Sequence, residues 1–436
     1  MIARSLVAAF ALVMAAGAHA QTEIQWWHSM EGANNDKVNE LANKFNASQP
    51  DYRIVPVYKG KYPESMTAAI AAFRAGNAPH ILQVFEVGTA TMMAAKGAVV
   101  PVAKVMRDAD EPFNPKRYLP AVAGYYTDQK GDMLSFPFNS STVVFYVNKD
   151  AFKKAGLDPE KAPRTWKEFL GAAEKLKAAG QDCVYTTGWP AWMHIENLGA
   201  WHNVPIGTKE NGMAGFDTQF TFNDPLHVRH IAMLGDMSKR GLLTYAGRQN
   251  QAEANFASGQ CAMLTSSTGA QGTIRRTAKF GWSVNMIPYH DDVKGAPQNS
   301  IIGGASLWVM GGKTNNAYKG IAKFFAYLSQ PEVQMEWHTG TGYVPITMEA
   351  YEMTRKSGFY EKNPGADIAV KQLNNKPPTG NSKGLRFGNY VQGREVIEEE
   401  IEQVLAGKKD AKSALDEAVR RGNEILRKFE AANRSR

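Results

Sequence analysis

One glutamate stands in an otherwise apolar run, and its position is the first in the chain to suggest chemistry. Glu86 lies in the segment QVFEVGT, where we expect a β-strand over residues 81–87. An unpaired buried carboxylate is costly, so Glu86 must either meet a cation or face a cleft. There its oxygens would accept hydrogen bonds from hydroxyl groups. This residue alone predicts a polar cleft.

Paired carboxylates or histidines would instead indicate a secreted hydrolase of phosphoesters or glycosides. Glu86 and Glu196 could form the carboxylate pair, and His194 and His202 could be metal ligands. The two histidines, however, have no clear third ligand, and Gly199 interrupts the segment between them. The sequence also contains no HExxH, GxSxG or triad-like set of motifs. It therefore favours a binding protein over an enzyme, and we expect no metal site and no cofactor.

The hydrophobic pattern predicts a scaffold of alternating strands and helices. Strands are expected over residues 24–27, 52–58 and 81–87, and helices over residues 36–47 and 65–74. Strand–helix–strand repetition with short loops is typical of an α/β domain with a mostly parallel sheet.

A second set of elements begins near residue 138. A strand is expected over residues 143–147, and Thr165 and Glu168 form a capping box that begins a helix. The chain is then expected to return to the first domain before ending in long helices. The sequence contains no low-complexity linker, so we expect the chain to cross several times between two lobes. Such an arrangement leaves a cleft between the lobes.

The first twenty residues are typical of a secretory signal peptide. Arg4 supplies a positive charge, residues 5–17 are small and almost all apolar, and Ala18-His19-Ala20 is an A-x-A exit. A membrane anchor is the alternative, but the apolar run is shorter than the roughly 20 residues that span a bilayer. We expect cleavage after Ala20 and export to the periplasm.

Composition and charge are those of an ordinary globular protein. Of the 436 residues, 44% are hydrophobic and 21% are charged. The net charge of +8 could suggest nucleic acid, but basic and acidic residues are interleaved and there is no basic block. We therefore expect no nucleic-acid partner. Export permits a disulfide between the two cysteines, Cys183 and Cys261, and two buried free thiols are the alternative.

Several segments resemble the extracellular solute-binding proteins of carbohydrate-type ABC importers. The opening ELANKFNASQPDYRIVPV and the closing GKKDAKSALDEAVRRGNEIL carry this resemblance. Other segments are similar to those of family members that bind sn-glycerol 3-phosphate, and together they cover essentially the whole mature chain. They are WHSMEG, YKGKYPESMTAAIAAFRAGNAP, QVFEVGTATMMA, PFNSSTVVFYVNKDAFKKAGLDP, APQNSIIGGASLWVM and GFYEKNPGADIAVKQLNNKPP.

The resemblance implies a two-lobed periplasmic-binding-protein fold of the α/β class, the type II or Venus-flytrap fold. Each lobe would be a mostly parallel sheet flanked by helices. The expected divisions are a signal peptide over 1–20, lobe I over 21–137 plus 286–340, and lobe II over 138–285 plus 341–436.

The resemblance also implies a function. A monomeric, non-catalytic protein would capture sn-glycerol 3-phosphate, or a glycerophosphodiester such as glycerophosphocholine, in the cleft between the lobes. It would deliver the ligand to the permease subunits of an ABC transporter in the inner membrane. An unphosphorylated sugar or oligosaccharide is the alternative ligand.

Phosphate is bound in proteins by arginine, hydroxyls and backbone N–H groups. By resemblance, Arg394 in VQGREV is the phosphate clamp, although the local sequence favours a surface pair with Glu398 at i+4. Gly304 in IIGGAS would donate its backbone N–H, since glycine lets a ligand approach closely, although a Gly-Gly pair is often only a turn.

The remaining implied ligand contacts come from serines, tyrosines and tryptophans. Ser141 and Ser267 are expected at strand ends, where hydroxyls can reach a cleft, and caps or turns are the alternative. By resemblance, Glu86 accepts hydrogen bonds from the glycerol hydroxyls, and two tyrosines and two tryptophans wall the pocket. All four aromatic residues could instead be structural, and Pro190-Ala191 between the tryptophans leaves their geometry open. They are Tyr62, Tyr343, Trp189 and Trp192.

Overall fold

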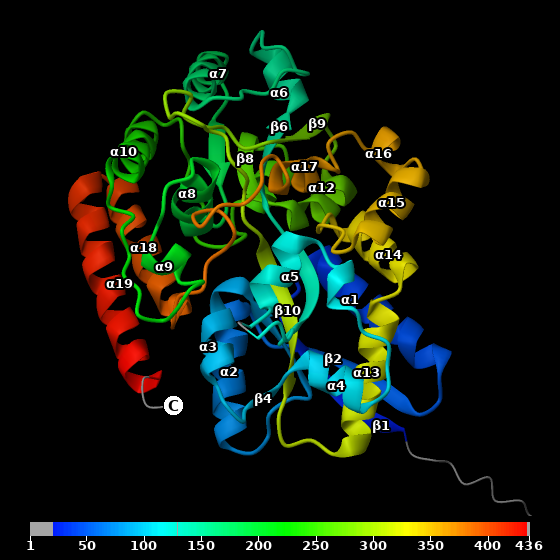
Figure 1. The fold of residues 1–436 in the computed structure, drawn as a ribbon. Helices are drawn as coiled ribbons and strands as arrows, with labels where there is room; N and C mark the ends of the chain where they lie inside the picture. Colours follow the sequence, from blue (N-terminus) through cyan, green and yellow to red (C-terminus); the bar gives the residue numbers. More distant parts are fainter. Residues whose placement is uncertain (1–20, 129, 434–436) are drawn as a thin grey trace, which may run out of the picture.

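The computed structural model describes residues 21–128 and 130–433, so the predicted signal peptide lies outside the described residues. Within these ranges the chain forms two lobes, each built on its own β-sheet and flanked by helices (Figure 1). In the same ranges, no helix combines the length and the apolar character needed to cross a membrane.

The sheet of the first lobe is mixed. Its strand order is β2-β1-β3-β10-β4, with β5 also paired to β10. β1 pairs in parallel with β2 and β3, whereas β10 is antiparallel to all its neighbours. The expectation of a mostly parallel sheet is therefore wrong here, because β10 enters from the second lobe instead of following a strand–helix–strand crossover. The strands are β1 (Thr22–His28), β2 (Tyr52–Tyr58), β3 (Ile81–Phe85), β4 (Val99–Val100), β5 (Phe136–Ser141) and β10 (Gly303–Met310).

Helices of this lobe bury the apolar stripes that the sequence pattern indicated. On α13, Ile321, Phe324 and Phe325 recur at helical spacing and are fully buried. The same holds on α1, where Val38, Leu41, Ala42 and Phe45 are buried. The helices are α1 (Gly32–Ser48), α2 (Tyr62–Arg74), α3 (Thr89–Ala94), α4 (Val102–Asp108), α5 (Pro120–Tyr126), α13 (Asn315–Leu328) and α14 (Pro331–Thr341).

The sheet of the second lobe is mixed as well, and a disulfide joins two of its strands. Its order is β7-β8-β6-β9, and only the pair β7–β8 is parallel. Cys183 and Cys261 lie opposite each other at the start of this pair and are bonded, with their Cα atoms 4.5 Å apart. The alternative of two free thiols is thereby removed. The strands are β6 (Val143–Asn148), β7 (Cys183–Thr187), β8 (Cys261–Ser267) and β9 (Trp282–Asn285).

The capping box predicted at Thr165 is confirmed. The backbone N–H of Glu168 donates to the Thr165 hydroxyl at 3.1 Å, and the Thr165 N–H donates to the Glu168 carboxylate at 3.2 Å. The helix that it begins is α7 (Trp166–Ala178). The other helices are α6 (Lys149–Lys154), α8 (Leu198–Trp201), α9 (Thr208–Asn211), α10 (Pro225–Lys239), α11 (Glu253–Ala257), α12 (Gln271–Thr277), α15 (Met348–Lys356), α16 (Phe359–Lys362), α17 (Ile368–Leu373), α18 (Tyr390–Leu405) and α19 (Ala411–Asn433).

The long C-terminal helices α18 and α19 lie against α10 at the side of the second lobe, as Figure 1 shows. The start of α18 also reaches the turn that follows β3 in the first sheet. Helix α18 therefore contacts both lobes.

Two chain crossings between the sheets lie side by side. The first runs directly from β5 to β6 with only Thr142 between them, so the expected boundary at residues 137 and 138 falls within β5. The second covers residues 286–302, between β9 and β10. The Thr142 hydroxyl donates to the carbonyl of Ile301 at 2.9 Å and lies 2.8 Å from Ser300 Oγ. Both crossings are thus tied together where the two lobes meet.

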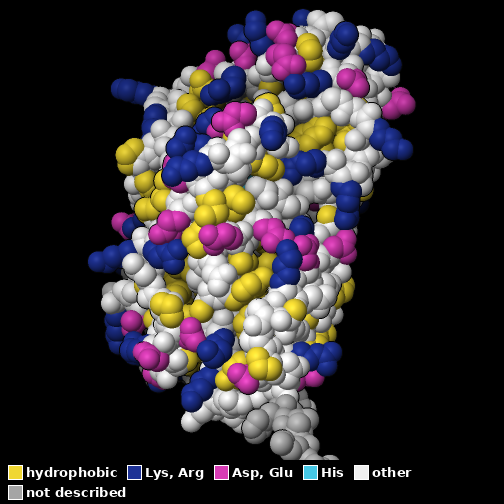
Figure 2. All heavy atoms as spheres, turned by 90° about the vertical axis from the view of Figure 1, so that its right-hand side faces the viewer, with side chains coloured by type: hydrophobic (Ala, Val, Ile, Leu, Met, Phe, Trp, Pro, Cys, Tyr) yellow, Lys and Arg dark blue, Asp and Glu magenta, His cyan; other side chains and the backbone are white. Residues whose placement is uncertain are grey.

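The charged surface shows no block of one sign on the face drawn in Figure 2. Lysine and arginine are interspersed there with aspartate and glutamate. That the protein has no nucleic-acid partner stays a prediction.

Candidate functional site

A small cavity between the lobes brings together all nine residues that the sequence singled out. Elements far apart along the chain supply them, from the start of α2 to the first turns of α18. Phe85 lines the same cavity, and its ring stacks on that of Tyr62 with 5.0 Å between centroids. That these residues bind a ligand stays a prediction. The nine are Tyr62, Glu86, Ser141, Trp189, Trp192, Ser267, Gly304, Tyr343 and Arg394.

Glu86 lies just past the end of its strand. The strand predicted over residues 81–87 ends at Phe85, and Glu86 begins a 3₁₀ turn that runs to Gly88. The predicted strand was therefore two residues too long. The side chain is only 4% exposed, and it lies at the carboxyl end of β3, the edge where α/β sheets place ligand contacts.

Arg394 is the cation that Glu86 requires. Its Nη2 donates to Glu86 Oε1 at 2.7 Å and to Glu196 Oε2 at 2.6 Å, and its Nε donates to Glu196 Oε1 at 2.8 Å. The Tyr390 hydroxyl also donates to Glu196 Oε1, at 2.9 Å. We call these four residues the Arg394 network. The pair with Glu398 that the local sequence favoured is replaced by two partners from other elements.

The Arg394 network carries a net negative charge when both carboxylates are ionised. Burial raises the pKa of Glu86 and the nearby charge of Glu196 adds to the rise, although Arg394 opposes it. Burial alone would lower the pKa of Arg394, but the charges of Glu196 and Glu86 outweigh it and hold that pKa well above its usual value. Two carboxylates already share this guanidinium, and the role of Arg394 as a phosphate clamp stays a prediction.

Hydroxyl groups in the cavity keep their protons available. Asn139 Nδ2 donates to the Tyr62 hydroxyl oxygen at 3.0 Å, and the Gly269 N–H donates to Ser267 Oγ at 3.0 Å. Each oxygen already accepts a hydrogen bond, so its own O–H is left to donate to a ligand. Sequence reasoning did not single out Asn139 as a functional residue.

Glycine is required at both positions of the Gly303-Gly304 pair, which begins β10 and is not merely a turn. Gly304 has φ +85°, and a Cβ there would lie 1.8 Å from the carbonyl oxygen of Asn139. A Cβ on Gly303 would lie 2.2 Å from the ring of Trp192. The absent side chains leave room for the Trp192 ring at Gly303 and for the Asn139 carbonyl at Gly304.

The two tryptophans stand on an unusual stretch of backbone. Trp189 has φ +54°, in the left-handed region, and its N–H donates to the carbonyl of Gln249 at 2.8 Å. Trp192 begins a π-helix, Trp192–Asn197, that also carries Glu196. The two side chains are therefore not on one face of an α-helix. One short segment instead positions a tryptophan wall and a carboxylate of the Arg394 network.

Three histidines in a row contact one another and connect this π-helix to α10 and to the segment that follows β9. His194 Nδ1 lies 3.0 Å from His230 Nε2, and His230 Nδ1 lies 3.0 Å from His290 Nε2. Burial lowers the pKa of His194 to about 3 and that of His290 to about 4, so both are neutral at pH 7. Residues 21–128 and 130–433 contain no group of three or more metal-ligating side chains placed to hold an ion.

Removing the guanidinium tests the Arg394 network. Arg394→Ala should lower the free energy of unfolding by about 3–5 kcal/mol, because it leaves Glu86 and Glu196 buried without a cation. Arg240→Ala is the control, since Arg240 pairs with Glu174 and Asp236 at the surface, where ion pairs contribute little to stability. Urea unfolding measures both variants. Equal losses for the two would contradict the network.

Acid should destabilise the protein through its histidines. Their pKa values are lower in the folded protein than the usual 6.5, so the unfolded chain binds protons that the folded chain cannot. The free energy of unfolding should fall as pH drops from about 7 to 5, by up to about 1.4 kcal/mol per pH unit for each such histidine. Urea midpoints across this range measure it, and His290→Gln should reduce the slope. A slope in His290→Gln equal to that of the wild type would contradict the effect.

Comparisons with known proteins agree with this architecture. A model of the bacterial extracellular solute-binding protein family matches residues 40–367. The sn-glycerol-3-phosphate-binding periplasmic protein UgpB of Yersinia pseudotuberculosis is 54% identical over 431 residues, which cover 99% of this chain and 98% of that protein. UgpB of Pectobacterium atrosepticum is 56% identical over 427 residues, with 98% and 96% covered.

Solved structures share the fold at low sequence identity. UgpB from Mycobacterium tuberculosis, in complex with glycerophosphocholine, has a TM-score of 0.77 at 20% identity and covers 94% of this chain and 99% of its own. The GacH receptor of Streptomyces glaucescens has a TM-score of 0.78 at 18% identity and covers 94% and 100%. The expected two-lobed periplasmic-binding-protein fold is thereby confirmed, and the chain belongs to the bacterial extracellular solute-binding protein family.

Proposed function

We propose that this protein is the periplasmic binding component of an ABC importer that captures sn-glycerol 3-phosphate and glycerophosphodiesters such as glycerophosphocholine. Two relatives above 50% identity over almost the whole chain carry the name of a glycerol-3-phosphate-binding protein. The observation that carries the proposal is the cavity itself. It combines a carboxylate–guanidinium pair, free hydroxyl donors and tryptophan walls in one enclosed space.

The charge distribution indicates how the ligand lies. The glycerol diol faces Glu86 and Arg394. Its neutral hydroxyls can donate to a carboxylate and accept from a guanidinium without electrostatic repulsion. A phosphate of charge −1 to −2 placed there would meet a net negative network. At 4 Å, each like-charge pair costs about 4 kcal/mol at an effective dielectric constant of 20.

The phosphate therefore lies at the other end of the cavity, against neutral donors. Tyr62 and Ser267 offer free O–H groups, and Gly304, whose backbone N–H is the third proposed donor, lines the same cavity. Ser141 lies opposite Gly303 at the end of β5, directly before the crossing to the second lobe. Donors from both lobes thus meet at the phosphate, so binding favours the closed arrangement of the lobes.

We further propose that the protein is a monomer that delivers its ligand to permease subunits without transforming it. Glu86 and Glu196 both hydrogen-bond one nitrogen of Arg394, so they are not placed on opposite sides of a bond as an acid and a base would be.

Isothermal titration calorimetry tests the proposed ligand class. The protein should bind glycerol 3-phosphate and glycerophosphocholine and should not bind maltose. Glu86→Gln should weaken both phosphorylated ligands about 10-fold or more, because the charged acceptor for the diol is lost. Ser267→Ala should weaken them about 10-fold through the phosphate, whereas exposed Ser258→Ala should change nothing.

Tight binding of maltose would reassign the protein to an unphosphorylated sugar. Full affinity for glycerol 3-phosphate in both site variants would also defeat the proposal. Multiple turnover of a glycerophosphodiester by the purified protein would show an enzyme instead.

A further inference from the structure

A second, larger cavity continues outward from the small one, and we call it the outer chamber. It measures about 260 Å³ and shares Tyr62, Trp189, Ser267 and Tyr343 with the inner cavity. The shared residues include two of the three phosphate donors inferred above, Tyr62 and Ser267. The outer chamber therefore begins where a glycerol 3-phosphate ends. Glycerol 3-phosphate bound as proposed leaves it unused.

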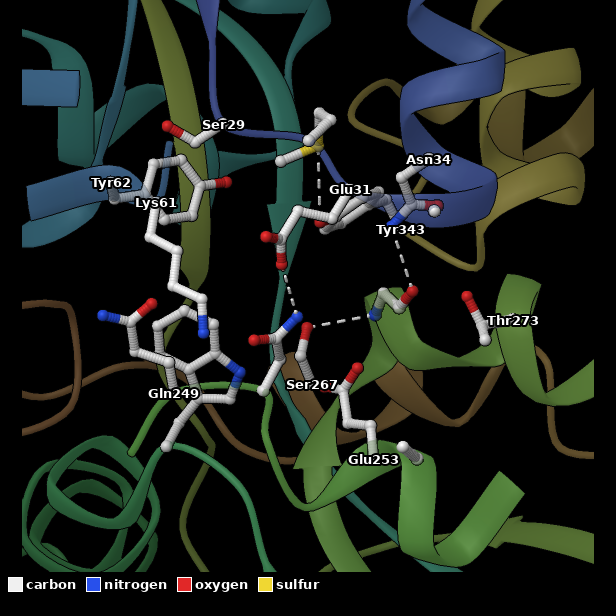
Figure 3. Close-up of a pocket in the computed structure, with 16 residues that line it drawn as sticks. Ser29, Glu31, Asn34, Lys61, Tyr62, Gln249, Glu253, Ser267, Thr273 and Tyr343 are labelled. Atoms are coloured by element: carbon white, nitrogen blue, oxygen red, sulfur yellow. Dashed lines mark hydrogen bonds between the residues drawn. The ribbon is translucent and has the colours of Figure 1, made fainter. Parts of the chain in front are cut away.

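The outer chamber has charged groups of both signs. Figure 3 shows Glu31, Lys61 and Glu253 around it, with Lys61 reaching along the side of Tyr62 toward Gln249. Lys61 takes part in none of the ion pairs formed among residues 21–128 and 130–433. Two carboxylates and one ammonium give a wall with both an acidic and a basic part.

The two carboxylates are held in place by neutral donors only. Glu31 accepts from the Tyr58 hydroxyl at 2.7 Å and from Asn250 Nδ2 at 3.1 Å. Glu253 accepts from the Ser266 hydroxyl at 2.7 Å. Among the described residues neither carboxylate forms an ion pair with a lysine or arginine, although Lys61 lines the same chamber, so each carboxylate is open to pairing with a cationic ligand.

Two further lining groups, Ser29 and Glu253, indicate that the chamber binds a polar ligand. The Ser29 hydroxyl lines the chamber and has no hydrogen-bond partner, although the residue is only 7% exposed. Buried hydroxyls are nearly always paired, so an unpaired one beside a cavity indicates a polar ligand atom or water. Burial also raises the pKa of Glu253 to about 7, and a bound cation would favour its ionised form.

Contacts between the lobes span the chamber. Glu31, which precedes α1, binds Asn250 near α11, and Asn34 Nδ2 donates to the carbonyl of Gly269 at 3.3 Å. A group held in the chamber is therefore enclosed when the lobes close.

We propose that the outer chamber binds the second alcohol of a glycerophosphodiester and favours an alcohol that carries a cationic amine. Glu31 and Glu253 face the amine, Trp189 offers it an aromatic surface, and Lys61 faces the phosphodiester. This inference rests on the proposed function, because it needs the phosphate at the junction of the two cavities. A neutral alcohol such as glycerol gains nothing from the two carboxylates.

Calorimetry with matched ligands tests the proposal. The wild-type protein should bind glycerophosphocholine more tightly than glycerophosphoglycerol, which has the same phosphodiester and a neutral second alcohol. Glu31→Gln combined with Glu253→Gln keeps the size of each side chain and one acceptor oxygen at each position, and removes both charges. This variant should weaken glycerophosphocholine about 10-fold and change glycerol 3-phosphate and glycerophosphoglycerol less than about 2-fold. Glu174→Gln, at a surface pair with Arg240, is the control and should change no ligand.

The same titrations distinguish a wrong inference about the outer chamber from a wrong proposed function. An equal loss for all three ligands would show that the carboxylates only support lobe closure, and an unchanged affinity for glycerophosphocholine would show that they do not meet the amine. Either result overturns the inference while the proposed function stands. Wild-type protein that binds none of the three ligands would overturn both.

Discussion

The guanidinium of Arg394 is shared by two buried carboxylates, and the shape of the cavity depends on this contact. Glu86 comes from the turn after β3, Glu196 from the π-helix and Arg394 from α18. None of the three is more than 5% exposed, so separating the charges would leave at least one unpaired in a poorly solvated place. The pairing therefore fixes where three distant segments meet. Because Trp192 shares the π-helix with Glu196, the tryptophan wall is positioned by the same contact.

This constraint also divides the cavity by charge. Its deep end, with one cation and two anions, suits neutral hydroxyl groups. Its outer end has neutral O–H and N–H donors, and beyond it lies a chamber with charges of both signs. A glycerophosphodiester has the same sequence of groups, since a diol is followed by a phosphate and then by a second alcohol. The match in order, more than any single contact, makes this ligand class the best fit.

Much of the fold could be predicted from local patterns, whereas contacts across the chain could not. The strand over residues 52–58, the buried stripe of α13 and the capping box at Thr165 all follow from short-range rules. Strand direction was mispredicted, because alternating elements do not reveal that β10 crosses from the other lobe. The partner of Arg394 was also missed locally, since Glu196 lies 198 residues away and Glu398 is only one turn along the helix. The nine site residues do share one cavity, but their grouping came from resemblance and not from spacing.

A crystal structure of the complex with glycerol 3-phosphate would show which groups bind the diol and which bind the phosphate. We expect Arg394 to keep its hydrogen bonds to Glu196, the glycerol hydroxyls to contact Glu86, and the phosphate oxygens to lie within about 3 Å of Tyr62, Ser267 and the Gly304 N–H. A complex in which Arg394 has left Glu196 to bind the phosphate through two parallel hydrogen bonds would contradict this expectation.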